Sequence, residues 1–210
     1  MARIFKQCEI NSVLDIGANQ GQFAKSLRKR GYAGEIHSFE PVADSFKVLQ
    51  QYSSSDANWY VYNIALGDEC AFKDIHVSKA SDLSSFLPAS NFGSKRFASM
   101  AETHTETVEI STVDMFLSEN DELFKDKKIF LKMDTQGFDV RVFNGARDSW
   151  PAIAGLLSEL SFQKIYKGIP TYLEALSVYE QAGYKITGLF PIVRNNDLTL
   201  VEMDCVMIKS

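Results

Sequence analysis

The sequence is poor in cysteine, contains no long apolar run and has no excess of positive charge, and each shortage excludes a class of protein. Its three cysteines, Cys8, Cys70 and Cys205, cannot all pair within the chain and lack the close spacing of a zinc site. No window approaches the ~18 consecutive apolar residues of a membrane-spanning helix, and residues 1–10 contain no signal-peptide apolar stretch. We therefore expect reduced thiols, no transmembrane segment and a cytoplasmic protein.

The charge balance is acidic, with 22 Lys and Arg against 27 Asp and Glu. A net charge of -5 argues against a nucleic-acid partner, because such proteins usually carry a basic surface. The densest basic run, residues 25–30, ends a predicted helix, where cations complement the helix dipole. The composition is that of a globular protein, and a chain of this length fits one hydrophobic core. We expect one domain over residues 1–210, and leave the oligomeric state open.

Apolar runs alternate with helical patterns along the chain. The first third predicts strands at 12–17, 35–40 and 59–66 with helices at 20–30 and 43–52, a βαβαβ order that implies a parallel sheet. Right-handed crossovers place helices on both faces of such a sheet. Further along, the pattern predicts strands at 74–78, 107–113, 128–134 and 153–160, and helices at 114–124, 138–146 and 171–183.

The last two predicted strands, 184–190 and 200–208, are separated by a turn too short for a crossover helix, so they should pair antiparallel. The whole pattern predicts an α/β fold. We expect a single Rossmann-like domain with a mostly parallel seven-stranded sheet, an antiparallel C-terminal hairpin and helices on both faces. This hairpin is typical of the methyltransferase variant of the Rossmann fold.

Residues 79–106 are polar, rich in Ser, Ala, Asn and Thr, and weakly periodic, so we interpret them as a loop. A loop of this length in a compact domain is usually a lid or a substrate-binding segment, and the alternative is a disordered insertion. Its large apolar side chains could cover an acceptor or anchor the loop to the core, and they are Phe86, Phe92, Phe97 and Met100.

The clearest local motif is the run DIGANQG at residues 15–21, between the first strand and the first helix. Gly17 permits a sharp turn, Gly21 permits close approach, and the helix N-terminus offers unpaired backbone donors. A dehydrogenase would have a middle glycine where this chain has Asn19. Asp15 would repel a pyrophosphate, whereas it suits the ammonium group of S-adenosylmethionine.

A second motif ends the next strand with Phe39 and Glu40, about two dozen residues after the glycine turn, where an acid accepts hydrogen bonds from ribose hydroxyls. The third strand ends near Asn63 and Ala65, which could contact adenine, although a plain structural turn at 67–68 explains part of that segment. Together the two motifs predict a nucleotide site.

With these motifs, the sequence resembles the FkbM family of S-adenosylmethionine-dependent O-methyltransferases over most of its length. The matching runs are DIGANQG, FEP, ALGD, TVD and KMDTQG, followed by the carboxylate of Glu159. The family commonly has V-E-G and then E, where this chain has Thr135, Gln136, Gly137 and Asp139. The resemblance implies S-adenosylmethionine as cofactor and a sugar hydroxyl on a glycan, glycolipid or secondary metabolite as acceptor.

Three carboxylates, Asp134, Asp139 and Glu159, follow the fourth strand or lie near the end of the fifth, where ligands bind in open α/β sheets. One of them could act as general base, they could together hold Mg²⁺, or the site could act by positioning alone. His104 in the loop is another candidate base, while His37 in a strand is interpreted as structural. Polar side chains that could bind a polyhydroxylated acceptor are Asn63, Ser84, Ser85 and Lys132.

Two other functions fit parts of this pattern. An NAD-linked oxidoreductase would use the same fold, but the missing middle glycine argues against it. A non-catalytic module could keep the nucleotide fold and present residues 79–106 to a partner such as a glycosyltransferase; the retained Asp15, Glu40 and Asp134 argue against that.

Overall fold

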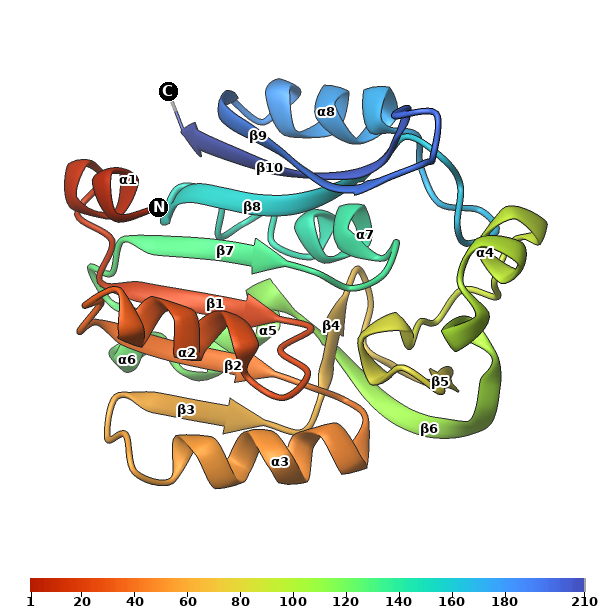
Figure 1. Ribbon diagram of the computed structural model, residues 1–210. Helices are drawn as coiled ribbons and strands as arrows, with labels where there is room; N and C mark the ends of the chain where they lie inside the picture. Colours follow the sequence, from red (N-terminus) through yellow and green to blue (C-terminus); the bar gives the residue numbers. More distant parts are fainter. Residues whose placement is uncertain (210) are drawn as a thin grey trace.

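The computed structural model describes residues 1–209, which form a seven-stranded sheet in the order β3-β2-β1-β7-β8-β10-β9 (Figure 1). The strands are β1 (Ser12–Ile16), β2 (Glu35–Phe39), β3 (Trp59–Tyr62), β7 (Ile129–Met133), β8 (Ile153–Ser161), β9 (Tyr184–Arg194) and β10 (Leu200–Lys209). All neighbours from β3 to β8 pair in parallel, and β10 pairs antiparallel with both β8 and β9. The predicted mostly parallel sheet with a C-terminal hairpin is confirmed.

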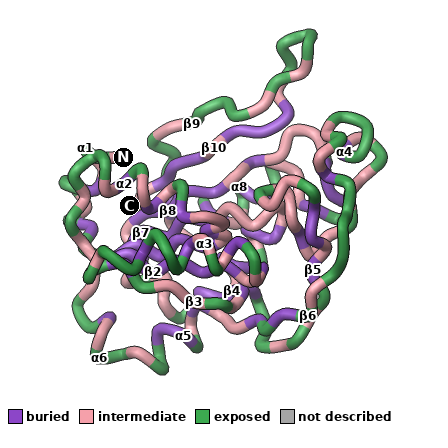
Figure 2. The backbone as a smooth tube through the Cα atoms, turned by 60° about the horizontal axis from the view of Figure 1, so that its bottom comes forward, coloured by how far each residue is buried: buried purple, intermediate pink, exposed green. Residues whose placement is uncertain are grey.

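Helices cover both faces of this sheet, as predicted. Alternate side chains of β1 point to opposite faces, so Val13 packs in one cluster with α1, α2 and α3, while Leu14 and Ile16 pack in the other with α5 to α8. The central strands are therefore buried, whereas β9 at the edge is largely exposed (Figure 2). The helices are α1 (Ala2–Gln7), α2 (Gln22–Lys29), α3 (Ala43–Ser53), α5 (Val113–Glu119), α6 (Asp121–Phe124), α7 (Asp139–Asn144) and α8 (Tyr172–Gln181).

A second, three-stranded sheet was not predicted. It has the order β4-β6-β5, with bounds β4 (Ala65–Gly67), β5 (Ala71–Ser78) and β6 (Glu102–Thr112). The single strand predicted at 59–66 was wrong, because β3 ends at Tyr62 and β4 belongs to the other sheet. The strand predicted at 107–113 was too short, since residues 102–107 are almost all polar and exposed and so carry no apolar alternation.

Residues 79–106 are ordered and packed, which corrects their interpretation as a loop. They contain the 3₁₀ helices η1 (Ser81–Leu83) and η2 (Ala98–Met100), the helix α4 (Asn91–Arg96) and the start of β6. Apolar side chains from this segment join a cluster with Ile165, Tyr166 and Val201. The segment also approaches the backbone closely, since a Cβ on Gly93 would lie 2.2 Å from the Ile165 carbonyl oxygen.

The predicted start of α5 differs from the structure by one residue, whereas the predicted glycine at the end of α8 has the expected conformation. The helix predicted from Asp114 begins one residue earlier, because the Thr112 side chain caps it by accepting from the Met115 N–H at 3.0 Å. At the end of α8, Gly183 has a φ of 90°, as its predicted helix-ending role requires. Within residues 1–209, no helix combines the length and apolarity needed to cross a membrane.

Candidate active site

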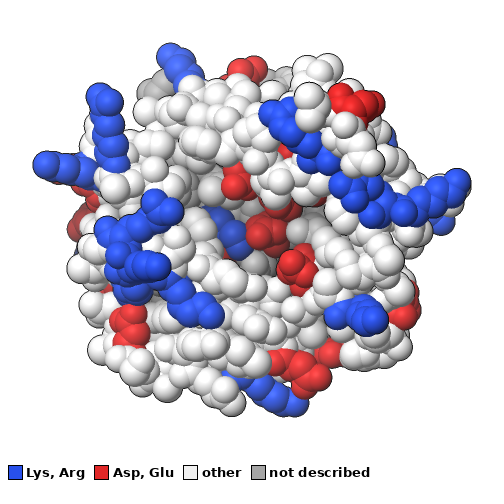
Figure 3. All heavy atoms as spheres, viewed as in Figure 1, with Lys and Arg blue, Asp and Glu red and all other residues white. Residues whose placement is uncertain are grey.

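A cavity of about 220 Å³ lies at the carboxyl ends of β1, β2 and β7, with β4, β5 and η1 forming its opposite wall. Its position is the point where the strand order reverses, between β1 and β7, which is where open α/β sheets bind ligands. Figure 3 shows a hollow at this place with acidic side chains around it and one basic side chain inside. The candidate active site is this cavity.

The turn after β1 is built around Gly17, which has a φ of +72°. A Cβ on this residue would lie 2.0 Å from the backbone oxygen of Asp134, so the turn packs directly on the end of β7. Asn19 also adopts a left-handed conformation, at a φ of 48°. Its backbone N–H donates to Glu40, and its side-chain oxygen accepts from Ser81 Oγ at 3.1 Å. The turn thus connects the end of β2 with residues 79–106, here called the insertion.

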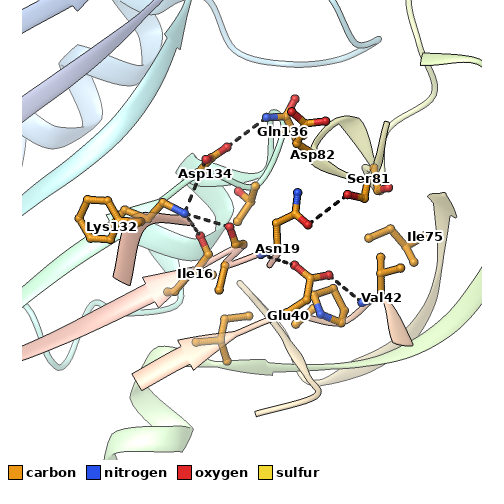
Figure 4. A pocket seen from close by; sticks show the side chains of 18 of the residues that line it. Ile16, Asn19, Glu40, Val42, Ile75, Ser81, Asp82, Lys132, Asp134 and Gln136 are labelled. Atoms are coloured by element: carbon orange, nitrogen blue, oxygen red, sulfur yellow. Dashed lines mark hydrogen bonds and ion pairs between the residues drawn. The ribbon is translucent and has the colours of Figure 1, made fainter. Parts of the chain in front are cut away.

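Glu40 is almost completely buried at the end of β2. Its two oxygens accept from the backbone N–H groups of Asn19 and Val42, both at 2.8 Å (Figure 4). Burial raises the pKa of Glu40 to about 7, although these two N–H donors act in the opposite direction. Because each carboxylate oxygen can accept two hydrogen bonds, both retain capacity for ligand hydroxyls.

Beneath the turn, Asp15 is fully buried and does not line the cavity. The Lys132 ammonium lies 3.0 Å from Asp15 Oδ1 and 2.9 Å from the Gly17 carbonyl oxygen. Burial alone would lower the pKa of Lys132, but the attraction of Asp15 and Asp134 outweighs it and raises this pKa above the usual range. Asp15 is therefore neutralised by Lys132, and it reaches a ligand only through this ion pair.

Asp134 is the predicted catalytic carboxylate that the structure does place in the cavity. Its side chain is 39% exposed, and each of its oxygens faces a different neighbour. Oδ2 lies 3.6 Å from the Lys132 ammonium, and Oδ1 accepts from the Gln136 side-chain amide at 3.0 Å (Figure 4). The carboxylate is thus held at the mouth of the cavity with lone pairs left for an acceptor.

Asp139 lies outside the cavity, and its contacts favour a structural role over the predicted role as base or metal ligand. Its carboxylate accepts from Thr135 N at 2.9 Å, Thr135 Oγ1 at 2.5 Å, Ser158 Oγ at 2.8 Å and Glu159 N at 3.0 Å. Four donors match the four lone pairs that a carboxylate offers. Asp139 therefore joins the turn after β7 to β8.

Glu159 lies behind the cavity, where its Oε2 accepts from the Gln136 amide at 3.2 Å. Burial raises the pKa of Glu159 well above its ordinary value, and repulsion from Asp134 and Glu202 adds to this, which favours the protonated acid. Within residues 1–209, no three or more His, Cys, Asp or Glu side chains are arranged to hold a metal ion. The geometry gives no support to a magnesium site at Asp134, Asp139 and Glu159.

The other predicted site residues lie at different distances from the cavity. His104 is half-exposed on β6 and pairs with Thr103 and Glu106 outside it. Asn63 donates to two backbone carbonyls after β2, so it braces a turn.

Three predicted cofactor-binding residues remain: Gly21 and Phe39 of the two nucleotide motifs, and Ala65 of the third-strand segment. Phe39 packs in the core and Gly21 precedes α2, and neither of them lines the cavity. Ala65 does line it. The part of the third-strand motif that meets the cavity is therefore its apolar residue.

Several lining residues were missed by sequence reasoning. Ser81 and Asp82 come from η1, inside a segment without periodicity, and Gln136 was noticed only as a departure from the family pattern. Phe86 also lines the cavity and packs on Phe138, with ring centroids 5.0 Å apart. The other large side chains of the insertion, Phe92, Phe97 and Met100, instead anchor it to the core.

The sheet order, the antiparallel hairpin and the cavity at the switch point place the chain in the class of proteins with the Rossmann-like methyltransferase fold. Within this class, the chain belongs to the methyltransferase FkbM domain family, which it matches over residues 15–186. This membership and the fold favour a methyltransferase over the NAD-linked alternative.

Solved structures share this fold at low identity. An FkbM methyltransferase from Methylobacillus flagellatus KT has a TM-score of 0.56 and 14% identity, over 94% of this chain and 44% of that one. The methyltransferase domain of bacterial CtHen1 has a TM-score of 0.52 and 11% identity, over 99% of this chain and 94% of the other. Aeropyrum pernix fibrillarin, solved with natively bound S-adenosyl-L-methionine, has a TM-score of 0.51 and 10% identity, over 94% of this chain and 66% of that one. No curated protein matches the chain.

Proposed function

We propose that this chain is an S-adenosylmethionine-dependent O-methyltransferase that methylates a hydroxyl group of a sugar, on a glycan, a glycolipid or a secondary metabolite. One observation carries the proposal. A single cavity contains both the buried Glu40 carboxylate, with lone pairs to spare, and the exposed Asp134 carboxylate. The first suits a nucleoside, and the second suits an acceptor whose proton must be removed.

The cavity residues fit the cofactor. Glu40 can accept from both ribose hydroxyls, because its backbone donors use only one lone pair on each oxygen. The apolar side chains of Val42, Leu66 and Ile75 line the same cavity and offer a surface for a flat adenine ring. The acidic surroundings complement the positive charges of S-adenosylmethionine.

Methyl transfer then requires an aligned acceptor and a base. When bound, S-adenosylmethionine supplies a methyl group on a sulfonium, which the acceptor oxygen attacks in line as sulfur takes the bonding electrons. Asp134 accepts the proton of that hydroxyl. Lys132 and Gln136 hold one Asp134 oxygen each, so the carboxylate does not have to reorient during the reaction.

The charge of the cavity favours a neutral, polyhydroxylated acceptor. Glu40, Asp82 and Asp134 line it together with one cation, Lys132, which is already paired with Asp15. Acidic walls repel phosphate and carboxylate groups, whereas sugar hydroxyls can donate hydrogen bonds to them. This supports an acceptor hydroxyl on an uncharged part of a sugar.

Calorimetric titration tests the cofactor, followed by transfer of a labelled methyl group to a panel of sugars. We expect S-adenosylhomocysteine to bind and NAD not to bind, and Glu40→Ala to abolish binding. With an active acceptor, Asp134→Asn should reduce turnover by about 10²–10⁴-fold, the usual contribution of a general base. Affinity for S-adenosylhomocysteine should change only a few-fold, and His104→Ala should behave as the wild type.

Other results would contradict the proposal in distinct ways. Binding of NAD alone would exclude the methyltransferase, and binding of neither compound would favour the non-catalytic module. Full turnover in Asp134→Asn would remove the base assignment while leaving the cofactor assignment intact.

A further inference from the structure

The Gln136 side chain connects three polar groups from three parts of the chain. Its Nε2 donates to Asp134 Oδ1 at 3.0 Å and to Glu159 Oε2 at 3.2 Å, and its Oε1 accepts from the Tyr166 hydroxyl at 2.9 Å. An amide nitrogen has two hydrogens, so both are used. Both amide hydrogens are therefore used, by Asp134 directly after β7 and by Glu159 on β8, while the amide oxygen faces the segment that follows β8.

The orientation of this amide is fixed by chemistry. The NH₂ end faces Asp134, because the amide carbonyl oxygen would be repelled by that carboxylate. The Tyr166 hydroxyl faces the amide oxygen and shares its single hydrogen with the Leu83 carbonyl oxygen, which also lies 2.9 Å away; the Gln136 backbone carbonyl accepts from Ser85 Oγ at 2.8 Å. The main chain at Gln136 is left-handed, with a φ of 52°, a conformation that non-glycine residues rarely adopt. Contacts on both the backbone and the side chain hold Gln136 in place.

Two carboxyl groups facing one point ordinarily need a proton or a cation between them. The Gln136 amide occupies that point with two N–H donors and carries no charge. A glutamate, the residue that the FkbM pattern commonly has here, would instead bring a third carboxyl group to the same place. The amide, together with the proton that burial favours on Glu159, therefore allows Asp134 and Glu159 to lie together without a bridging ion.

We propose that Gln136 is a positioning residue that takes the place of a bridging divalent cation and aims Asp134 into the cavity. The inference rests on the proposed role of Asp134 as the base. It predicts that this enzyme turns over without added metal, and that replacing the amide by a carboxylate creates a cation site.

Titration with Mn²⁺ in saturating S-adenosylhomocysteine, followed by electron paramagnetic resonance of the free ion, tests the created site. Gln136→Glu changes one amide into a carboxylate of the same shape, and Gln181→Glu makes the same change on the exposed surface of α8. We expect Gln136→Glu to bind Mn²⁺ at least about tenfold more tightly than the wild type or Gln181→Glu, because affinity rises with the number of charged ligands. Equal affinity in folded Gln136→Glu and Gln181→Glu would overturn the proposal.

A second variant keeps the test decisive if Gln136→Glu does not fold. Gln136→Met keeps the size and removes both N–H donors, so kcat should fall at least about tenfold while KM for the acceptor changes by less than about twofold, since Asp134 loses the contact that aims it. The titratable groups around this point are Lys132 on β7, Asp134 directly after β7, Asp139 on α7, Glu159 on β8, Tyr166 after β8, and Glu202 and Asp204 on β10. An unchanged kcat in Gln136→Met, with Asp134→Asn inactive, refutes the positioning role alone; an active Asp134→Asn refutes the base itself.

Discussion

The two walls of the cavity are built in different ways. The wall at residues 15–21 and Glu40 is shaped by the main chain, through the left-handed turn at Gly17 and backbone donors to the Glu40 carboxylate. The wall formed by η1 and Gln136 is held by side chains that reach across the fold. A main-chain site leaves a short local motif in the sequence, whereas a wall of distant side-chain contacts leaves none.

The contacts of the second wall span long stretches of chain. Ser81 bonds to Asn19 across 62 positions and Ser85 to residue 136 across 51, and the Tyr166 hydroxyl shares its hydrogen between Gln136 and the Leu83 carbonyl, 83 positions away. Each is one hydrogen bond, with a net value of about 0.5–1.5 kcal/mol. Single substitutions should therefore have large effects in the first wall and small, separable effects in the second.

The largest effect is expected for Gly17→Ala. The new Cβ would meet the Asp134 backbone oxygen at 2.0 Å, so the turn and the end of β7 would have to separate, at a cost of about 3 kcal/mol or more. Affinity for S-adenosylhomocysteine should fall at least about 100-fold, because the turn forms the floor of the cavity. Urea unfolding and calorimetric titration measure the two effects.

Gly31→Ala is the matched control. Gly31 has a φ of +86°, but a Cβ added there would have no atom within 4 Å, so only the conformational cost of about 1 kcal/mol applies, and ligand binding should be unchanged. Similar losses in the two variants would mean that left-handed strain, and not contact with β7, makes Gly17 necessary.

The next effect is a pH dependence of stability that separates Glu40 in the first wall from Glu202 and Asp204 on β10, which line neither wall. Burial raises the pKa of Glu40 and of Glu202 to about 7 each, and that of Asp204 to about 6. At these three groups the native state holds protons that the unfolded state has released, so their contribution to the unfolding free energy should fall as pH rises from about 4.5 to 7. Buried His37, whose pKa burial lowers to about 4, contributes in the opposite direction. For Glu40 alone, this loss is of the order of 3 kcal/mol.

Urea unfolding at pH 5 and pH 8 measures this difference with and without S-adenosylhomocysteine. Ribose hydroxyls that donate to Glu40 should lower its pKa and remove its part of the slope, as Glu40→Gln should in the free protein. The contribution of Glu202 to the pH dependence of the unfolding free energy should persist with ligand and disappear only in Glu202→Gln. A slope that ligand leaves untouched would contradict direct contact between Glu40 and the cofactor.

The same contrast explains how much of the fold and of the cavity the sequence predicts. The alternating apolar runs and the short final turn were sufficient for the seven-stranded sheet and its hairpin, because burial on both faces dictates them. The run at 15–21 and Glu40 located the first wall, since glycine turns and a strand-ending acid are local features. The second sheet was not predicted because residues 102–107 are all polar and all but Glu106 are exposed, so they carry no apolar alternation.

The carboxylates show why the catalytic residues were harder to predict from the sequence than the nucleotide motifs. Spacing brings Asp134, Asp139 and Glu159 to one edge of the sheet, but it cannot tell which carboxylates are already consumed by hydrogen bonds. Asp139 is saturated by four donors, and Glu159 is paired with an amide. Only the three-dimensional arrangement separates the exposed Asp134 from its occupied neighbours.

The smallest effect is expected for Ser81→Ala, which tests whether the insertion closes the cavity. Ser81 Oγ donates to Asn19 Oδ1 at 3.1 Å and is the direct side-chain link between η1 and the nucleotide turn. Losing one such bond should speed dissociation of S-adenosylhomocysteine about threefold, with little change in the association rate. Stopped-flow displacement measures both rates. Ser54→Ala is the control, because that hydroxyl donates to the Gln51 carbonyl at the exposed end of α3. If Ser81→Ala and Ser54→Ala release the ligand at the same rate, the two walls act independently and η1 does not retain the cofactor.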